Sequence, residues 1–442
     1  MTFATPPDQS HFFGYYDKSP LSTDGRYLLA HRVSFEGRPV ERSDVAEIGY
    51  FDLQTGHWHM LAVTSAFNWQ QGAMLQWLGP DFQSRVIYNA QEGDHFVARV
   101  TDFASGNLRT IPHAVYAVHP SGQSALGVRF ERHYFCRAYH YEGVRDERWN
   151  VPVHPEDGIL AIDLETGAVR LLLRTAEIAN LDPTPAMTGV PHWLEHLMWN
   201  RAGTRFGFLH RYGSHDSYVT RVFTSDADGT HLFCLPWHAE YSYTHMGWRD
   251  ETTFVNFAGK LKPLTKAYAS MVGSTNPLKA ITVRAWRALK RIIPRDFVDP
   301  WRADSGYALV RDREGVQKWL SMGLLRSDGH PSWTHDGRFM VADTYADEVG
   351  YRQLLLYDAA ADRVHSAGRF FSPFNACSYR CDLHPRFSRD ECHIIIDTAH
   401  TGRRQMLVLD VNCRNLAGSG EVCRGANKAP LIQTEPNSHR RN

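Results

Sequence analysis

Long hydrophobic runs, an excess of one charge and paired cysteines are all missing from this chain of 442 residues. No stretch approaches the roughly 18 apolar residues that a membrane-spanning helix needs. The N-terminal residues also lack the charged and apolar regions of a secretory signal. We therefore expect a cytoplasmic protein. The 48 basic and 48 acidic side chains cancel, which argues against broad electrostatic attraction to nucleic acid.

The cysteines are few and irregularly placed. There are seven, an odd number with no regular spacing, as expected of reduced thiols. Cys377 and Cys381 are close enough in sequence to share a metal ion, but a second pair does not accompany them, so the signal for a cysteine-bound metal is weak. With 43% hydrophobic and 22% charged residues, the composition is that of an ordinary globular protein.

Histidine is abundant instead, with 24 residues, and its placement is periodic. Four segments begin with His, carry an aromatic residue three positions later, and continue through a polar turn into an apolar strand. They read HLMWNRAG, HMGWRDE, HPSWTHDG and HPRFSRDE, and start at His196, His245, His330 and His384. The same frame extends back to segments that start at Lys18, Met74 and Val115. The chain therefore holds seven repeat units.

The repeat predicts an all-β fold, a seven-bladed β-propeller. Units without insertions are about 40 to 55 residues long, the period of four-stranded propeller blades. Later strands of a blade are visible in EIGYFDLQTGHWHML and RQLLLYDAAADRVHSAG, which alternate apolar and polar residues around turns. We expect an N-terminal arm at residues 1–10, the propeller at 11–418 and a flexible C-terminal tail at 419–442. Several unrelated all-β domains would not explain the shared frame.

Two spacings between repeat units are long and indicate insertions. One lies between Val115 and His196, and the other, in the fifth blade, covers residues 258–302. From Gly259 to Arg295 the second insertion has nine Lys/Arg and no Asp/Glu, and NPLKAITVRAWRALKRII has helical periodicity. We expect a mainly helical basic insertion. It would serve as a lid over an anionic ligand, as a patch of residues 259–295 on an anionic membrane, or as a solvated helix packed on the propeller rim.

The repeated histidines share one frame position. In a propeller the innermost strand of each blade runs along the central axis, so residues of one frame position form a ring at one end of the channel. Imidazole nitrogen and carboxylate oxygen are common ligands of divalent ions such as Mn²⁺, Ca²⁺ or Zn²⁺. The alternative is that these histidines only bond neighbouring backbone. The predicted metal ligands are His196, His245, His330, His384 and Asp382, which lies two positions before His384.

Short motifs over most of the chain resemble a known family. WQQGAMLQW, EHLMWNRAG, THMGW, DGHPSW, CDLHPRFS and HTGRRQMLVLDV are similar to segments of the seven-bladed propeller polysaccharide lyases of the oligogalacturonate lyase type. Propellers that act on other uronate linkages, such as ulvan lyases, fit as well. The resemblance implies a His base in the segment after the fourth-blade strand, where this chain has His210, and metal-binding histidines in the following blades. His245 matches best; the family's clustered Gln and paired His ligands are not reproduced.

β-Elimination at a uronic acid requires three groups. The substrate carboxylate must be neutralised by a divalent ion or an arginine, and Arg211 and Arg380 are the candidate clamps. A base must remove the C5 proton, for which His210 is predicted. An acid must protonate the leaving oxygen, a role open to Tyr243, Tyr212 or water. The predicted substrate-binding residues are Lys18, Tyr16, Tyr212 and Arg404, and the predicted ligand is an anionic oligosaccharide or polysaccharide.

Two other functions stay open from the sequence. A non-catalytic glycan-binding or scaffold propeller associated with glycan metabolism would use the same fold. A glycoside hydrolase would need two acidic residues facing each other across the site, for which Asp328 and Asp382 are available in the repeat frame. A cytoplasmic location suits short imported oligosaccharides or a role beside glycan assembly. The sequence does not predict the oligomeric state.

Overall fold

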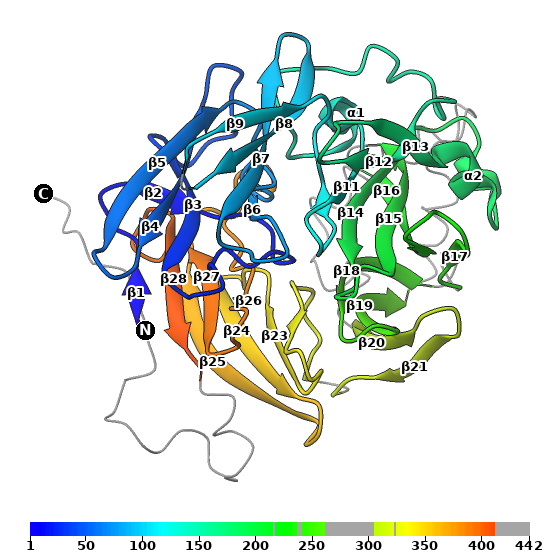
Figure 1. Ribbon diagram of the computed structural model, residues 1–442. Helices are drawn as coiled ribbons and strands as arrows, with labels where there is room; N and C mark the ends of the chain where they lie inside the picture. The colour runs from blue at the N-terminus through cyan, green and yellow to red at the C-terminus, as the bar shows by residue number, and fades with distance from the viewer. Residues whose placement is uncertain (104, 215–216, 237–240, 261–304, 322–323, 412–442) are drawn as a thin grey trace, which may run out of the picture. The chain divides into compact units, whose positions relative to one another are not determined.

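The computed structural model describes residues 1–442 except 104, 215–216, 237–240, 261–304, 322–323 and 412–442. It contains seven four-stranded sheets, and each first strand pairs antiparallel with its neighbour in the sheet (Figure 1). In six sheets the strands pair in chain order, and in the seventh the first strand of the chain joins the last three. The seven-bladed β-propeller that the repeat predicts is therefore the fold.

The chain divides into two compact units. The first comprises Met1–Gln91, Arg99–Thr110 and the chain from Gly329 onward, and the second comprises Glu92–Ala98 and Ile111–Asp328. The first unit holds β1 (Phe3–Ala4), β2 (Ser10–Phe12), β3 (Tyr27–Val33), β4 (Ala46–Asp52), β5 (His57–Thr64), β6 (Gln76–Trp77), β7 (Arg85–Glu92), half of β8 (His95–Asp102), β9 (Leu108–Ile111), β22 (Ser332–Trp333), β23 (Phe339–Asp343), β24 (Tyr351–Asp358), β25 (Arg363–Phe371), β26 (Arg386–Phe387), β27 (His393–Thr398) and β28 (Gln405–Asp410).

The second unit holds three of the sheets and the short helices. Its elements are β10 (Ala117–Val118), β11 (Ser124–Gly127), α1 (Phe130–Cys136), β12 (Gly158–Asp163), β13 (Val169–Arg174), α2 (Thr175–Asn180), η1 (Pro185–Met187), β14 (His192–Trp199), β15 (Arg205–Ser214), β16 (Ser217–Asp226), β17 (Phe233–Cys234), β18 (Tyr241–Trp248), β19 (Thr253–Lys260), β20 (Ser305–Arg311) and β21 (Gly315–Trp319).

The seven-unit frame of the sequence is confirmed by strand pairing. In each sheet, the residue three positions after the frame residue pairs with the second strand of the same sheet. These pairs are Leu21 with Leu28, Trp77 with Val86, Val118 with Ala125, Trp199 with Phe206, Trp248 with Phe254, Trp333 with Met340 and Phe387 with Ile394. The ring of seven frame residues would draw on both units and stays a prediction.

Several frame residues also share an uncommon backbone conformation. Met74, His196 and His384 have φ angles of 53°, 56° and 43°. Residues other than glycine rarely take this left-handed conformation, which costs of order 1 kcal/mol or more and persists where surrounding contacts enforce it. Just before the inner strand pairs with its neighbour, the backbone therefore turns sharply at these positions.

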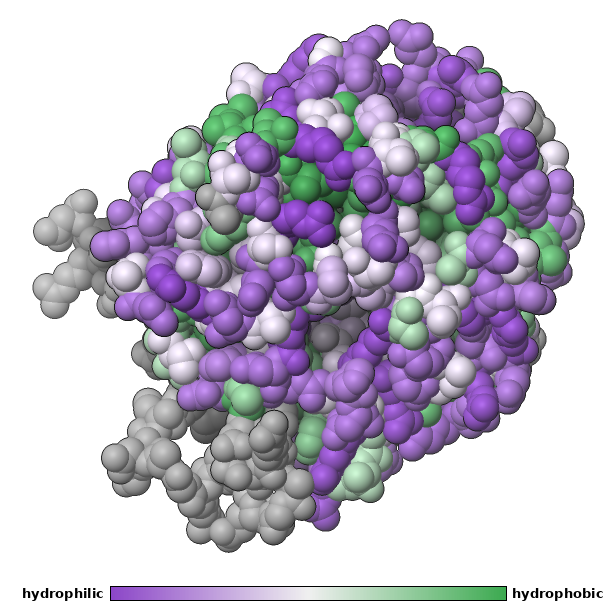
Figure 2. Space-filling model, viewed as in Figure 1, coloured by the Kyte–Doolittle hydropathy of each residue, from purple (hydrophilic) through white to green (hydrophobic). Residues whose placement is uncertain are grey.

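Apolar side chains of neighbouring sheets form the core. In the first unit, one cluster joins β22–β25 to the sheet of β26–β28 and buries Phe339, Val341, Leu354, Leu356, Phe370, Leu383, Phe387, Ile394, Ile396 and Leu407. The continuous buried run along β27, where three isoleucines precede Asp397, is typical of a strand covered on both faces. The face in Figure 2 is mainly hydrophilic, with smaller groups of hydrophobic side chains between.

In the first unit, a polar residue near the end of the second strand of a sheet holds the start of the next sheet. Asp397 of β27 accepts the backbone N–H groups of Phe13 and Gly14 at 3.1 Å each. His31 of β3 accepts the N–H of Ala73 at its Nε2, 2.9 Å away. These bonds satisfy buried backbone donors that have no strand partner, which would otherwise cost about 1–3 kcal/mol each.

The N-terminal residues complete the last sheet. Phe3 and Ala4 of β1 pair with Val408 and Leu407 of β28, which places a blue strand beside an orange one in Figure 1. The predicted arm, residues 1–10, therefore includes a strand of the propeller. Closing the last sheet with a strand from the opposite end of the chain removes an exposed sheet edge.

The basic insertion predicted at residues 258–302 lies almost entirely outside the described residues, and the helical conformation expected for it has no support in the structure. Its first residues belong to β19, a strand that ends at Lys260. The C-terminal tail predicted at 419–442 also lies outside the described residues. Among the residues that are described, none of the helices has the length and apolarity to cross a membrane.

His31 makes the stability of the fold dependent on pH. Its ring is fully buried, and burial lowers its pKa from 6.5 to about 4. Between these pH values the unfolded chain binds a proton that the folded chain does not, so stability falls as the pH falls. We expect the unfolding free energy of the wild type to fall by about 3 kcal/mol between pH 6.5 and pH 4 because of His31. A His31→Asn variant should not show this part of the loss. Urea denaturation across this range measures the difference, and parallel curves for the two proteins would contradict it.

Candidate metal centre

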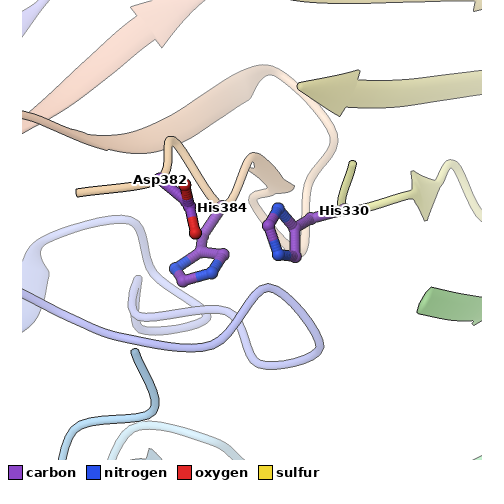
Figure 3. A group of neighbouring side chains, drawn as sticks. All are labelled: His330, Asp382 and His384. Carbon is purple, nitrogen blue, oxygen red and sulfur yellow. The ribbon is translucent and has the colours of Figure 1, made fainter. Parts of the chain in front are cut away.

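Three buried side chains of the first unit come together at the start of two inner strands. His330 lies two residues before β22, and Asp382 and His384 lie just before β26 (Figure 3). One ligand atom from each side chain lies within 4.8 Å of the other two. The imidazole rings of His330 and His384 are 4.2 Å apart and nearly perpendicular. Two nitrogens and one oxygen therefore converge on one buried point.

Asp343 holds both histidines in place. Its Oδ1 accepts the backbone N–H of His330 and lies 2.8 Å from the Nδ1 of the same residue. Its Oδ2 accepts the backbone N–H groups of Leu383 and His384 at 3.0 and 3.1 Å. Because Nδ1–H of His330 faces a carboxylate, Nε2 is the basic nitrogen of that ring. A carboxylate behind a histidine in this way is the usual support of a metal ligand.

Close packing before His330 leaves room only for glycine. A Cβ atom at Gly329 would lie 1.8 Å from the carbonyl oxygen of Asp343. Real Cβ atoms do not approach a backbone oxygen so closely, so any larger residue would push the chain off β23. The Asp-Gly-His sequence at 328–330 thus lets His330 reach the carboxylate of Asp343.

Asp382 is held by two arginines. Arg352 of β24 donates from Nε to one carboxylate oxygen at 3.1 Å, and Arg380 donates from Nε to the other at 2.5 Å. Burial alone would raise the pKa of Asp382, but Arg380 and Arg352 outweigh it and keep the pKa well below its ordinary value. Asp382 is therefore an anion at neutral pH.

The residues present fit a divalent metal ion. Nε2 of His384 is buried and has no hydrogen-bond partner among the described residues, which is costly unless something else binds it. Burial and the neighbouring His330 hold the pKa of His384 well below its ordinary value, so its imidazole is neutral, as metal ligation requires. Two imidazoles and an ionised carboxylate suit Mn²⁺ or Zn²⁺.

Two tyrosines cover the histidines from the segment after β2. The ring of Tyr16 lies 5.1 Å from that of His330, and the ring of Tyr15 lies 5.6 Å from that of His384. Tyr16, predicted to bind substrate, is only 1% exposed. Lys18, also predicted to bind substrate, is buried and pairs with Asp17 at 2.6 Å.

Arg404 was expected at the substrate and lies inside the first unit. Its guanidinium bonds Glu36 and donates to the carbonyl oxygens of Tyr379 and Arg380 at 2.6 and 3.1 Å. It also stacks on Trp69, 3.8 Å from the ring centre. These contacts give Arg404 a positioning role, because they fix the segment that carries Arg380 and Asp382.

The other predicted site residues lie in the second unit. His196 is 1% exposed, and its Nδ1 is 3.2 Å from Oε2 of Glu195. Arg211 and Arg137 both pair with Oε1 of that carboxylate, at 2.5 and 2.6 Å. Burial alone would raise the pKa of Glu195, but the two arginines hold it well below its ordinary value. Arg211, a predicted carboxylate clamp, thus has a carboxylate of the protein as partner.

His245 forms a histidine–carboxylate pair. Its Nδ1 lies 3.0 Å from Oδ1 of Asp328, and the hydroxyl of Thr244 donates to the same oxygen at 2.7 Å. The ring of His245 is 5.6 Å from that of His196, edge to face. Because Asp328 orients the ring, His245 has the arrangement of a general base. Tyr243, a predicted acid, donates its hydroxyl to the carbonyl oxygen of Pro236 at 2.9 Å.

His210, the predicted base, lies within β15 and is fully buried. Its Nε2 is 2.9 Å from Nδ1 of His192, whose own Nε2 is 2.9 Å from the carbonyl oxygen of Met187. A carbonyl oxygen accepts only, so His192 carries its proton on Nε2 and accepts at Nδ1 from His210. The basic nitrogen of His210 is therefore Nδ1. Tyr212 is also buried, with its ring 5.7 Å from that of His192.

Sequence reasoning missed the residues that support the metal centre. Asp343 ends the strand segment FMVAD, and Asp397 lies in IIIDT, at matching places in consecutive repeats. That coincidence was a readable signal, because an acidic residue inside a buried strand needs a partner. Nothing in the sequence pointed to Arg352 as the partner of Asp382.

Comparisons with known proteins bear on the fold. Neither protein-family models nor curated proteins give a match. Among solved structures, an oligogalacturonate lyase in complex with manganese is 17% identical, covers 92% of each chain and has a TM-score of 0.60. An oligogalacturonate lyase from Vibrio parahaemolyticus is 13% identical, with 93% coverage of each chain and a TM-score of 0.60. The β-propeller domain of the Trilobed protease from Pyrococcus furiosus is 10% identical, covers 90% of this chain and 96% of its own, and has a TM-score of 0.49. At these identities the two oligogalacturonate lyase structures show the fold alone.

Asp343 should be essential for the stability of the metal centre. In an Asp343→Ala variant three backbone N–H groups and the Nδ1–H of His330 lose their acceptor, so we expect the unfolding free energy to fall by about 3–5 kcal/mol. Asp343→Asn keeps one acceptor oxygen and should lose less. Chemical denaturation of both variants measures this. A loss below about 1 kcal/mol in the alanine variant would show that the carboxylate does not brace the two histidines.

Proposed function

We propose that the protein is a metal-dependent lyase that cleaves a uronic-acid linkage in an oligosaccharide or polysaccharide by β-elimination. The observation that carries the proposal is the buried His330, Asp382 and His384 group, with an unpartnered imidazole nitrogen at its centre. The fold shared with an oligogalacturonate lyase that contains manganese adds support.

Each requirement of β-elimination has a candidate in the chain. The two imidazoles and Asp382 would hold a divalent ion. When bound, that ion would supply positive charge that lowers the pKa of the C5 proton through the substrate carboxylate. Arg380 offers a planar guanidinium for the carboxylate. Tyr243 or water returns a proton to the leaving oxygen.

The base is proposed among the histidines of the second unit. His245 is oriented by Asp328 and retains 5% exposure, whereas His210 is wholly buried and bonded to His192. The histidine–carboxylate pair therefore favours His245 as the base, and the metal-ligand role that the sequence predicted for it stays a prediction. His210 stays the base that the family resemblance implies.

The lowered pKa of Asp382 argues against its use as the acid of a glycoside hydrolase. A glycoside hydrolase needs one carboxylic acid with a raised pKa to protonate the leaving group. Asp382 has the opposite shift, because Arg380 and Arg352 stabilise its anion. A non-catalytic glycan-binding propeller would need no neutral, unpartnered imidazole inside its core.

The activity is tested directly by absorbance. Elimination leaves a carbon–carbon double bond conjugated to the carboxylate of the product, which absorbs in the ultraviolet, whereas hydrolysis does not. Purified protein with Mn²⁺ should generate this absorbance from oligogalacturonates or another uronate oligosaccharide. If none of a panel of uronate oligosaccharides yields an absorbing product, the lyase proposal is wrong and glycan binding becomes the better one.

Metal content should depend on the triad. A His384→Ala or His330→Ala variant loses one of the three proposed ligands. We therefore expect its affinity for Mn²⁺ to be at least tenfold lower than that of the wild type, a loss that removal of a metal ligand or its support commonly causes. The matched control is His57→Ala, at an exposed position of β5. Metal analysis after dialysis measures the effect. Wild-type metal content in both triad variants would place the ion elsewhere.

The two candidate bases are separated by substitution. Removing a general base typically costs 10²- to 10⁴-fold in rate. We expect His245→Ala to lose that much elimination rate while it keeps its Mn²⁺, and His210→Ala to lose mainly stability, because it leaves Nδ1 of His192 without a donor. Turnover at fixed Mn²⁺ and thermal unfolding together measure this. The opposite pattern would assign the base role to His210.

A further inference from the structure

Asp382, one of the proposed metal ligands, already has both carboxylate oxygens engaged. Arg352 binds Oδ1 and Arg380 binds Oδ2. Each carboxylate oxygen has a further lone pair for a metal ion, but the two guanidinium charges beside it oppose a dication. Full ligation by Asp382 therefore competes with at least one of its arginine contacts.

The two arginines differ in how exposed they are. Arg352 is 1% exposed and also donates from Nη1 to the side-chain oxygen of Asn375 at 2.9 Å. Arg380 is 12% exposed, and its Nη1 reaches the exposed Cys377, 3.2 Å from the carbonyl oxygen and 3.3 Å from Sγ. Arg352 is thus fixed inside the unit, whereas Arg380 links the buried carboxylate to the surface.

The charges at the centre favour an anion once a metal is bound. Asp343 and Asp382 carry two negative charges, and Arg352 and Arg380 carry two positive charges. These four charges cancel, so a divalent ion leaves an excess of positive charge in a buried site. A ligand with one carboxylate reduces that excess, and the planar fork of Arg380 suits a carboxylate.

We propose that Arg380 exchanges partners when the site fills: the carboxylate of a bound sugar acid replaces Asp382 on Arg380, and Asp382 turns to the metal ion. Metal and sugar acid then bind cooperatively, each raising the affinity of the other by the same factor. The proposal rests on the metal centre of the proposed function and adds how that centre selects a carboxylated sugar.

The test measures Mn²⁺ binding, not turnover. Free Mn²⁺ is followed by electron paramagnetic resonance during titration of the full-length protein, alone, with galacturonate, or with galactose as the uncharged match. We expect galacturonate to tighten the Kd for Mn²⁺ about tenfold and galactose to leave it unchanged, in the range usual for coupled sites. The reciprocal titration on the wild type should show the same factor for galacturonate in the presence of Mn²⁺.

Arg380→Gln is the deciding variant. It removes the competitor of Asp382, so Mn²⁺ should bind it more tightly than the wild type in the absence of any sugar, and galacturonate should no longer change the Kd. The matched control is Arg369→Gln, an exposed arginine of β25 that pairs with Asp347 and should behave as the wild type. Should Arg380→Gln fail to fold, the wild type still tests the cooperativity. The factor by which galacturonate changes the Kd for Mn²⁺ must equal the factor by which Mn²⁺ changes the Kd for galacturonate.

The outcomes separate this proposal from the lyase proposal. If the triad binds Mn²⁺ with the same Kd in the presence and absence of galacturonate, the exchange of partners is overturned and the lyase proposal stands. Coupling that persists in Arg380→Gln overturns the role of Arg380. Coupling in a protein that eliminates no uronate substrate supports the exchange while the lyase proposal falls. Absence of Mn²⁺ binding with and without galacturonate overturns both.

Discussion

A buried carboxylate that accepts backbone N–H groups from the next repeat is the interaction on which the metal centre depends. Asp343 performs this task and also orients His330, so one side chain joins the stability of two sheets to the geometry of the candidate ligands. Asp397 repeats the arrangement toward Phe13 and Gly14, without a histidine to orient. The two repeats thus share a buried carboxylate that accepts backbone N–H groups, and at Asp343 this carboxylate also orients a candidate metal ligand.

The cost of this arrangement is concentrated in Asp382 and His384. The buried nitrogen of His384 lacks a hydrogen bond among the described residues, and its backbone is held in the left-handed conformation. Both features oppose folding by about 1–3 kcal/mol each. A bound ion would relieve the first by mass action on the folded state. Without an ion, the positive charges of Arg352 and Arg380 balance the negative charges of Asp382 and Asp343. This same balance limits how strongly an ion binds unaided.

Much of the fold was predictable from the sequence because the inner strand of each blade leaves a periodic mark. A frame residue, an aromatic or aliphatic residue three positions later, and a polar turn recur seven times, and each recurrence is a strand pair in the structure. The same frame predicts that His330, His384 and Asp382 lie together, as they do in the structure. It does so because consecutive blades present equivalent positions to one another.

Side-chain pairing was not predictable in the same way. Tyr16, Lys18 and Arg404 have the chemistry of substrate contacts, yet each is buried in contacts within the first unit, since a frame specifies where a side chain starts and not where it points. His245 was expected as a metal ligand and pairs with Asp328, because the two lie at the starts of neighbouring blades. The basic insertion lies outside the described residues, and its role stays a prediction.

The position of the ion is the most direct test of the metal centre. Crystals grown with Mn²⁺ and measured at the manganese absorption edge should give an anomalous peak about 2.0–2.2 Å from Nε2 of His330, Nε2 of His384 and an oxygen of Asp382, the usual range for nitrogen and oxygen ligands. A peak held by other residues, or none at this triad in protein that binds Mn²⁺ in solution, would contradict the assignment.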